Sequence, residues 1–269
     1  MINKRNYLDK YFTKKHISRK CCKIVKRNVS INPKKDLIIE PSAGNGSFII
    51  PIKSLSRNAM FFDIKPNDSR IKKINFLKIS NDLFRDYEKV NVIGNPPFGF
   101  KGSLAIKFIK KACEFCDSFS FILPKSFAKA SMQVSVPAYF HMVHSTVLPV
   151  NSFEYKGLDY DIPCVFQIWK KRGYKRRKIE KPKANGYSFV RTYEGADFAI
   201  RRVGSLAGKI IYTNLVNRNI NSHYFVKLKC KKDRKKLNDI NIGSTGYVTG
   251  ARSISKMDII NNLNKMLKN

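Results

Sequence analysis

The chain has 269 residues, of which 43% are hydrophobic and 12% aromatic, so it can bury a full core and is not a disordered chain. Its 53 Lys and Arg residues against 19 Asp and Glu residues give a formal net charge of +34 at pH 7. A charge of this size repels itself in a compact chain and favours a polyanionic partner, nucleic acid first and an anionic membrane surface a distant second.

Apolar runs and cysteine usage bear on where the chain resides. No run of 18 or more apolar residues occurs, so we expect no transmembrane helix and no membrane partner. The six cysteines lack the spacing of a disulfide scaffold, which favours reduced thiols in an intracellular compartment, the cytoplasm or nucleus ahead of an organelle. Cys113 and Cys116 form a C-x-x-C pair, but no second ligand pair accompanies them, so we expect no metal site.

The first two thirds of the chain alternate predicted strands and helices. Apolar residues at helical spacing predict helices over residues 14–28 and 104–112, and another helix opens at Phe48. Short apolar runs bounded by turn residues predict strands over residues 36–40, 60–64, 90–94, 118–123 and 165–169. This alternation predicts an α/β fold with a doubly wound, mostly parallel sheet.

A dense cationic run then changes the composition of the chain. We divide the chain there into residues 1–172 and a basic C-terminal region of residues 173–269. In the second region, Ser253 is the predicted N-cap of a final helix. The apolar positions of that helix are Ile254, Met257, Ile260 and Leu263.

A glycine-containing turn, residues 40–46, follows the first predicted strand. Gly44 and Gly46 permit a tight turn and the close approach of a ligand to the backbone. The third glycine of a dinucleotide-binding loop and the Gly-Lys-Ser/Thr of a phosphate-binding loop are both missing, which favours a cofactor without phosphates. Asp63 ends the next strand, where acids accept the hydroxyl groups of a ribose. Taken alone, residues 40–46 also fit an ordinary strand–helix loop.

The tetrapeptide Asn95-Pro96-Pro97-Phe98 follows the strand predicted over residues 90–94. Prolines cannot continue a central strand, because each lacks an N–H group and has a fixed φ. The chain must therefore turn and leave the Asn95 amide and the Phe98 ring at the carboxyl edge of the sheet, where open α/β sheets bind ligands. A turn without further function is the alternative for this tetrapeptide taken alone.

Together these motifs resemble the S-adenosylmethionine-dependent adenine-N6 methyltransferases that carry an Asn-Pro-Pro-Phe motif, over residues 8–170. The resemblance implies a Rossmann-like class I methyltransferase fold, S-adenosylmethionine as cofactor, and Asn95, Pro96, Pro97 and Phe98 as catalytic residues. The family often has Asp where this chain has Asn75, which weakens one expected hydrogen bond to the cofactor. The cofactor-binding residues that the resemblance implies are Tyr11, Phe12, Thr13, Glu40, Pro41, Ala43, Gly44, Gly46, Asp63, Ile64, Asn75, Phe76 and Asn95.

The motif suits methyl transfer to the exocyclic nitrogen of adenine. This nitrogen is a poor nucleophile. The Asn95 side-chain oxygen and the Pro96 carbonyl can accept hydrogen bonds from its two N–H groups, which orients the nitrogen and stabilises the charge that develops on it. Phe98 offers a stacking face to a flipped base. In similar enzymes a loop covers that base, and Phe153 lies in the corresponding segment of this chain. No metal is needed, because a sulfonium is itself a good leaving group.

The predicted substrate is nucleic acid, with DNA slightly favoured over RNA. Basic side chains after residue 169 are the predicted contacts to phosphates. Two alternatives remain: a protein glutamine N5-methyltransferase, which uses the same motif on a planar amide, and a non-catalytic subunit that binds nucleic acid or serves in assembly. The predicted nucleic-acid contacts, besides Phe153, are Lys170, Lys171, Arg172, Lys175, Arg176 and Arg177.

Overall fold

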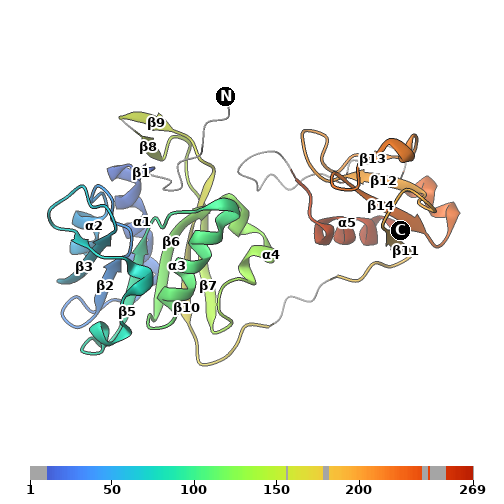
Figure 1. The fold of residues 1–269 in the computed structure, drawn as a ribbon. Coiled ribbons are helices and arrows are strands. Elements are labelled where there is room, and N and C mark those ends of the chain that lie inside the picture. The colour runs from blue at the N-terminus through green and yellow to red at the C-terminus, as the bar shows by residue number, and fades with distance from the viewer. Residues whose placement is uncertain (1–10, 156, 178–181, 238–241, 243–252, 269) are drawn as a thin grey trace. The chain divides into compact units, whose positions relative to one another are not determined.

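The structure is a computed structural model, and it describes residues 11–155, 157–177, 182–237, 242 and 253–268 (Figure 1). The chain forms two compact units, Met1–Arg177 and Lys178–Asn269, which we describe separately. Within the described part of the chain, no helix is both long and apolar enough to cross a membrane.

The first unit is built on a seven-stranded sheet of order β4-β3-β2-β5-β6-β10-β7. The strands from β4 to β6 are parallel, whereas β10 runs antiparallel to both of its neighbours. This arrangement confirms the predicted α/β fold with a doubly wound, mostly parallel sheet. The strands are β2 (Leu37–Glu40), β3 (Asn58–Asp63), β4 (Lys72–Lys73), β5 (Val90–Gly94), β6 (Ser118–Pro124), β7 (Phe140–Val147) and β10 (Cys164–Lys171).

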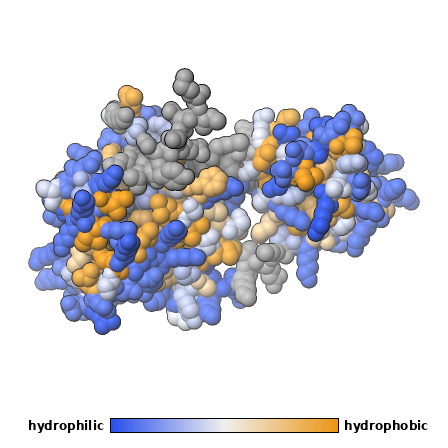
Figure 2. Space-filling model, in the orientation of Figure 1, coloured by the Kyte–Doolittle hydropathy of each residue, from blue (hydrophilic) through white to orange (hydrophobic). Residues whose placement is uncertain are grey.

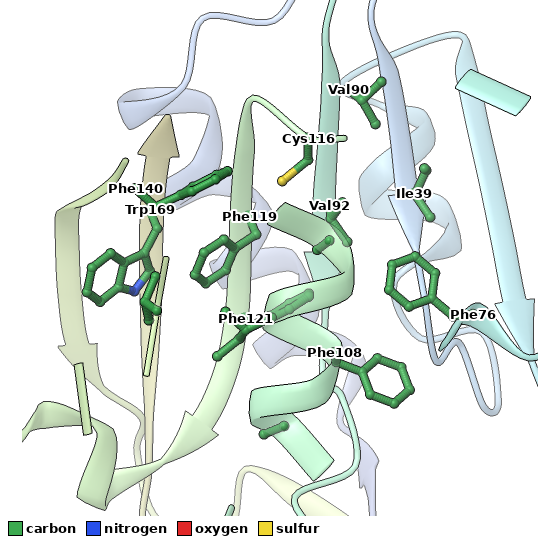
Figure 3. Close-up of a cluster of buried hydrophobic side chains, with 14 of the residues drawn as sticks. Ile39, Phe76, Val90, Val92, Phe108, Cys116, Phe119, Phe121, Phe140 and Trp169 are labelled. Atoms are coloured by element: carbon green, nitrogen blue, oxygen red, sulfur yellow. The ribbon is translucent and has the colours of Figure 1, made fainter. Parts of the chain in front are cut away.

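Two apolar cores cover the two faces of this sheet, because successive strand residues point to opposite faces. Leu37 and Ile39 belong to one core and Ile38 to the other. The first core packs against α3 (Ser103–Cys113), and Figure 3 shows its aromatic side chains between that helix and the strands. The second core packs against α1 (Lys15–Asn28) and α2 (Ile49–Lys53).

A second, three-stranded sheet lies at the carboxyl edge of the large one, at the top of Figure 1. It contains β1 (Phe12–Thr13), β8 (Phe153–Tyr155) and β9 (Leu158–Tyr160) in the order β1-β8-β9. An ion pair of 2.6 Å between Lys14 and Asp159 also joins the N-terminal segment to β9. The remaining elements of the unit are short: α4 (Ala130–Gln133), η1 (Phe76–Lys78), η2 (Asn81–Phe84), η3 (Phe100–Gly102) and η4 (Lys125–Ala128).

The second unit has its own antiparallel sheet and its own core. Its strands are β11 (Tyr187–Val190), β12 (Phe198–Arg201), β13 (Ile210–Ile211) and β14 (His223–Leu228), in the order β11-β14-β12-β13. One face of this sheet packs against α5 (Lys256–Lys268), so that the aromatic side chains of Tyr187 and Phe198 are buried. Two short 3-10 helices, η5 (Leu215–Asn217) and η6 (Lys231–Leu237), complete the unit.

The predicted N-cap of the final helix is wrong by two residues. Ser255 caps α5: its Oγ accepts the N–H of Asp258 at 3.2 Å, and the Asp258 carboxylate accepts the N–H of Ser255 at 3.1 Å. This reciprocal pair is a capping box. Ser253 instead forms an isolated bridge with Val203, and the Ile254 N–H donates to the Arg202 carbonyl. The extended pairing at residues 253–254 therefore displaces the start of the helix.

Candidate active site

A cavity of about 280 Å³ opens at the carboxyl ends of β2, β3 and β5. Its walls come from the segment before α1, the loops after these three strands, η1, the start of α3, and β8. The structure therefore brings six separate predicted segments to one place. The predicted site residues that line the cavity are Tyr11, Phe12, Pro41, Gly44, Asp63, Ile64, Asn75, Phe76, Asn95, Pro96, Pro97, Phe98 and Phe153.

Some predicted cofactor residues do not line the cavity, and some lining residues were not predicted. Thr13, Glu40, Ala43 and Gly46 lie outside the lining. Thr13, Glu40 and Ala43 are almost completely buried. For two of the residues that were not predicted, Leu104 and Phe108, the sequence offered a signal, since they follow the Asn-Pro-Pro-Phe motif at helical spacing. That pattern also fits residues of the core. The lining residues that the sequence analysis missed are Ser42, Lys65, Leu77, Leu104 and Phe108.

The side chain of Asn95 has an oxygen without a hydrogen-bond donor in the described part of the chain. Its Nδ2 donates a long hydrogen bond of 3.5 Å to the Tyr11 main-chain carbonyl. The Ser42 hydroxyl donates to the main-chain carbonyl of Asn95 at 3.0 Å. Oδ1 of Asn95 is buried, and none of the described residues donates a hydrogen bond to it. A buried acceptor without a donor costs free energy, so a site that retains one is suited to a ligand with an N–H group.

The Asp63 carboxylate connects two loops of the cavity. Its Oδ2 accepts the N–H of Gly44 at 2.8 Å and its Oδ1 accepts the N–H of Lys65 at 2.8 Å. A carboxylate has about four lone-pair sites, so both oxygens keep capacity for the hydroxyl groups of a ligand. Gly44 has φ 53°, and a Cβ there would lie 2.9 Å from the Phe12 ring. The turn after β2 therefore requires glycine at this position.

Glu40 is a buried acid behind the cavity wall. Its side chain is 2% exposed, its Oε2 has no hydrogen-bond partner among the described residues, and a Cβ on Gly94 would lie 3.2 Å from its Cγ. Burial, and then repulsion from the Asp63 carboxylate, raise the pKa of Glu40 well above its ordinary value. Glu40 is not among the residues that line the cavity, and its contact with a cofactor stays a prediction.

Asn75 and three buried phenylalanines, Phe76, Phe108 and Phe153, form an apolar part of the wall. Asn75 Oδ1 accepts the N–H of Leu77 at 3.0 Å and so caps η1. Phe76 is 1% exposed and stacks on Phe108, with ring centres 5.6 Å apart (Figure 3). Phe153, from β8, is fully buried in the wall. This part of the cavity offers flat apolar surfaces with one polar side chain.

The cationic run at the end of β10 lies at the amino edge of the sheet, where the parallel strands begin. Because β10 is reversed, Lys170 pairs with Ser118 at the start of β6, whereas Cys164 pairs with Pro124 at the end of β6. Six residue steps of about 3.3 Å place Lys170 ~20 Å from the carboxyl edge. In Figure 1 the run leaves the sheet at the bottom, away from β1, β8 and β9.

Arg176 within that run is occupied inside the protein. Its guanidinium donates to the carbonyls of Val136 at 2.7 Å and Gln133 at 3.3 Å, and lies 4.9 Å from the centre of the Trp169 ring. Desolvation lowers the pKa of Arg176. These contacts attach the end of the unit to its core. None of the predicted phosphate contacts of residues 170–177 lines the cavity.

The described residues contain no group of three or more His, Cys, Asp or Glu side chains that could hold a metal ion. Cys116 lies fully buried in the core beside α3, and burial raises the pKa of its thiol. Cys113 acts on the same thiol through a hydrogen bond. This pair therefore belongs to the packing around α3.

No protein-family model and no curated protein matches the chain. Solved structures do match it. A Pyrococcus horikoshii protein assigned to the RNA methyltransferases is similar at a TM-score of 0.48 and 16% identity, over 62% of this chain and 90% of its own. The 23S rRNA methyltransferase ErmE is similar at a TM-score of 0.44 and 11% identity, over 63% of this chain and 71% of its own. A SAM-dependent methyltransferase from Anabaena variabilis is similar at a TM-score of 0.42 and 10% identity, over 60% of this chain and 88% of its own.

These identities concern the fold alone. The seven-stranded sheet of the first unit, mostly parallel with the reversed β10 between β6 and β7, has the arrangement of the class I methyltransferase fold. In such open sheets the ligand site lies at the carboxyl ends of the strands, where the cavity is.

Proposed function

We propose that this protein is an S-adenosylmethionine-dependent methyltransferase that methylates N6 of adenine in nucleic acid. One observation carries the proposal: Oδ1 of Asn95 is buried, has no donor among the described residues, and belongs to a side chain that lines the cavity. An amino group that enters the cavity would supply the missing donor.

The donor set of the cavity fits S-adenosylmethionine. Asp63 offers carboxylate oxygens for ribose hydroxyl groups, and Ile64, Phe76 and Leu77 offer an apolar slot for a flat base. Lys65 is the only Lys or Arg among the lining residues, which suits a cofactor without phosphates. When bound, the cofactor supplies a methyl group on a sulfonium, which needs neither a metal nor a strong base.

Residues of the motif then orient the amino group that is methylated. Asn95 Oδ1 would accept a hydrogen bond from one N–H group and the Pro96 carbonyl from the other, which would orient the nitrogen for the transfer. As the new N–C bond forms, the methyl C–S bond of the sulfonium would break and leave a neutral thioether; positive charge would grow on the nitrogen, and both oxygens would stabilise it. Phe98, which is partly exposed and lines the cavity, offers its ring as a stacking face for the base, and the buried Phe153 ring lies in the wall of the same cavity. One proton of the amino group leaves to solvent after the transfer.

The net charge of +34 supports nucleic acid as the substrate over a protein glutamine. A glutamine side chain also presents an amide NH₂ that Asn95 Oδ1 accepts, so the motif by itself does not separate the two. The structure of the cavity supports a catalytic site over a subunit that only binds nucleic acid, because such a subunit has no need for a buried acceptor without a donor.

Methyl transfer from labelled S-adenosylmethionine to DNA, RNA and protein pools tests the proposal. We expect label in nucleic acid, and N6-methyladenine as the product after digestion to nucleosides, with DNA and RNA distinguished by the sugar. Asn95→Ala is the matched variant and should give no product. Label in protein glutamine, or cofactor binding by calorimetry without transfer to any pool, would contradict the proposal.

A further inference from the structure

The loop after the Asn-Pro-Pro-Phe motif presents an aromatic ring and a cation to solvent. Phe100 is 74% exposed, and Nζ of Lys101 lies 5.0 Å from the centre of its ring. Phe98 and Leu104, at the two ends of this loop, both line the cavity. The loop therefore stands at the mouth of the cavity, two residues beyond the motif itself.

The backbone of this loop is held in a defined shape. The N–H groups of Leu104 and Ala105 both donate to the Phe98 carbonyl, at 3.1 and 3.2 Å. Gly99 and Lys101 have φ values of 65° and 52°, and a Cβ on Gly99 would lie 2.8 Å from the Cβ of Leu104. An exposed ring on a loop that is already ordered loses little conformational entropy when it binds a partner.

The segment that follows β6 continues the same rim. β6 ends at the carboxyl edge, and η4 and α4 follow it at once. A Cβ on Gly102 would lie 2.9 Å from the Phe127 ring and 3.7 Å from Met132, so the loop packs directly against this segment. Lys129 lies between η4 and α4. We call residues 98–102 and 125–133 together the basic rim.

The basic rim and the chain around it contain no acidic residue. No Asp or Glu occurs in residues 89–113 or 118–153. The rim itself carries Lys101, Lys125 and Lys129. A surface whose charges are all positive, beside a low-dielectric cavity, focuses an electric field that attracts a polyanion.

The acids of the neighbouring β8–β9 hairpin oppose this field only in part. Asp159 is neutralised by its ion pair with Lys14 at 2.6 Å, whereas Glu154 accepts a hydrogen bond from the neutral Asn45 amide at 3.1 Å and keeps its charge. Asp161 is the third acid of this hairpin and its link to β10. Charge complementarity at the mouth therefore favours an anionic partner over the basic rim.

We propose that the nucleic-acid strand approaches the cavity over the basic rim, with Phe100 stacked on a base beside the target adenine and Lys101 and Lys129 bound to phosphates. The inference rests on the proposed function, and adds to it the surface that holds the substrate. It places this surface at the carboxyl edge, in contrast to the cationic run of residues 170–177 at the amino edge. Sequence-tolerant stacking and cationic contacts are the usual means of holding a single strand.

Binding of fluorescein-labelled single-stranded DNA and RNA of one adenine-containing sequence, measured by anisotropy on the full chain, tests the inference. Phe100→Ala should weaken binding about tenfold, and Phe100→Trp should restore it. The double variant K101Q/K129Q should reduce the salt dependence of the binding constant by the contribution of about two phosphates. Cofactor binding by calorimetry should remain within twofold, since neither Phe100, Lys101 nor Lys129 lines the cofactor part of the cavity.

Matched controls lie at the amino edge of the sheet. Tyr174 is a 66% exposed aromatic residue there, and Lys34 and Lys89 are exposed lysines just before β2 and β5. Tyr174→Ala and K34Q/K89Q should leave nucleic-acid binding within twofold. If these controls weaken binding and the rim variants do not, the inferred surface is wrong while the proposed function stands. If the wild-type protein binds neither nucleic acid and methylates protein instead, both are wrong.

Discussion

At the scale of single residues, the unpaired Asn95 oxygen gives the sharpest prediction. Asn95→Ala should lower the rate of methyl transfer about 10²- to 10³-fold, as the loss of one preorganised electrostatic contact does. The fold should survive, because the side chain makes only one long hydrogen bond to the residues that the structure describes. Single-turnover transfer with saturating cofactor measures the effect. Asn95→Asp, which keeps an oxygen acceptor, should retain measurable transfer, and equal losses in both variants would contradict this role.

Glu40 predicts how stability depends on pH. Its pKa is raised in the folded protein by burial and by Asp63, so the folded state keeps a proton that the unfolded state loses as the pH rises above the ordinary value of 4.5. This carboxyl should therefore lower the free energy of unfolding as the pH rises through that window, by up to about 1.4 kcal/mol per pH unit. Denaturant unfolding between pH 5 and 8 should show a flatter dependence for Glu40→Gln than for the wild type. An equal slope in both proteins would rule out this assignment.

At the scale of elements, two serines at the start of α5 have different structural roles. Ser255→Ala should lower the free energy of unfolding of the second unit by about 1 kcal/mol, because it removes the side chain of a capping box. Ser253→Ala should have a much smaller effect, since the pairing at that residue with Val203 uses the backbone. Denaturant unfolding of the full chain, followed by the helical circular dichroism signal, compares the two. A larger loss for Ser253→Ala would contradict the observed cap.

The direction of β10 changes the meaning of the charge run that follows it. In the sequence, residues 170–177 end the unit that holds the Asn-Pro-Pro-Phe motif. Periodicity identifies a strand over residues 165–169 but carries no information on its direction in the sheet. The antiparallel pairing with β6 and β7 then places the run at the amino edge.

At the scale of the whole molecule, the positive charge is shared by both units. Residues 1–177 contain 34 Lys and Arg against 13 Asp and Glu, and residues 178–269 contain 19 against 6. Figure 2 shows hydrophilic residues over much of the visible surface of each unit, with apolar patches between them. The charge is therefore a property of the entire chain, and residues 178–269 carry +13 of the net +34, close to their share of the length.

This distribution predicts a steep dependence of nucleic-acid binding on salt. The logarithm of the binding constant should fall linearly with the logarithm of the salt concentration, with a slope of about −0.7 for each phosphate neutralised on a single strand. Cofactor binding should change little over the same range, because Lys65 and Asp63 are the only charged side chains among the described residues that line the cavity. Parallel titrations between 50 and 300 mM salt, a range of roughly six in concentration, measure both. Nucleic-acid binding that ignores salt would contradict an electrostatic surface.

Much of the first unit was predictable, because its signals are local. The run of residues 90–94 is the observed β5, and the helix predicted over residues 104–112 is α3 with one more residue at each end. Thirteen predicted site residues line the cavity, because the carboxyl ends of parallel strands meet at one edge. The small sheet of β1, β8 and β9 was not predicted, since Phe12 and Glu154 pair across more than a hundred residues of chain.

The sequence by itself determined the class of fold, the edge at which the cavity lies and the residues at its centre, because these follow from local periodicity, prolines and glycines. Only the tertiary structure decided which of the predicted residues share one cavity, that Glu40 lies behind its wall, and that residues 170–177 lie away from it. It also decided that Phe100 and Lys101 stand at the mouth. The physical reason is that strand direction and long-range pairing arise from burial of whole faces, which no short stretch of sequence encodes.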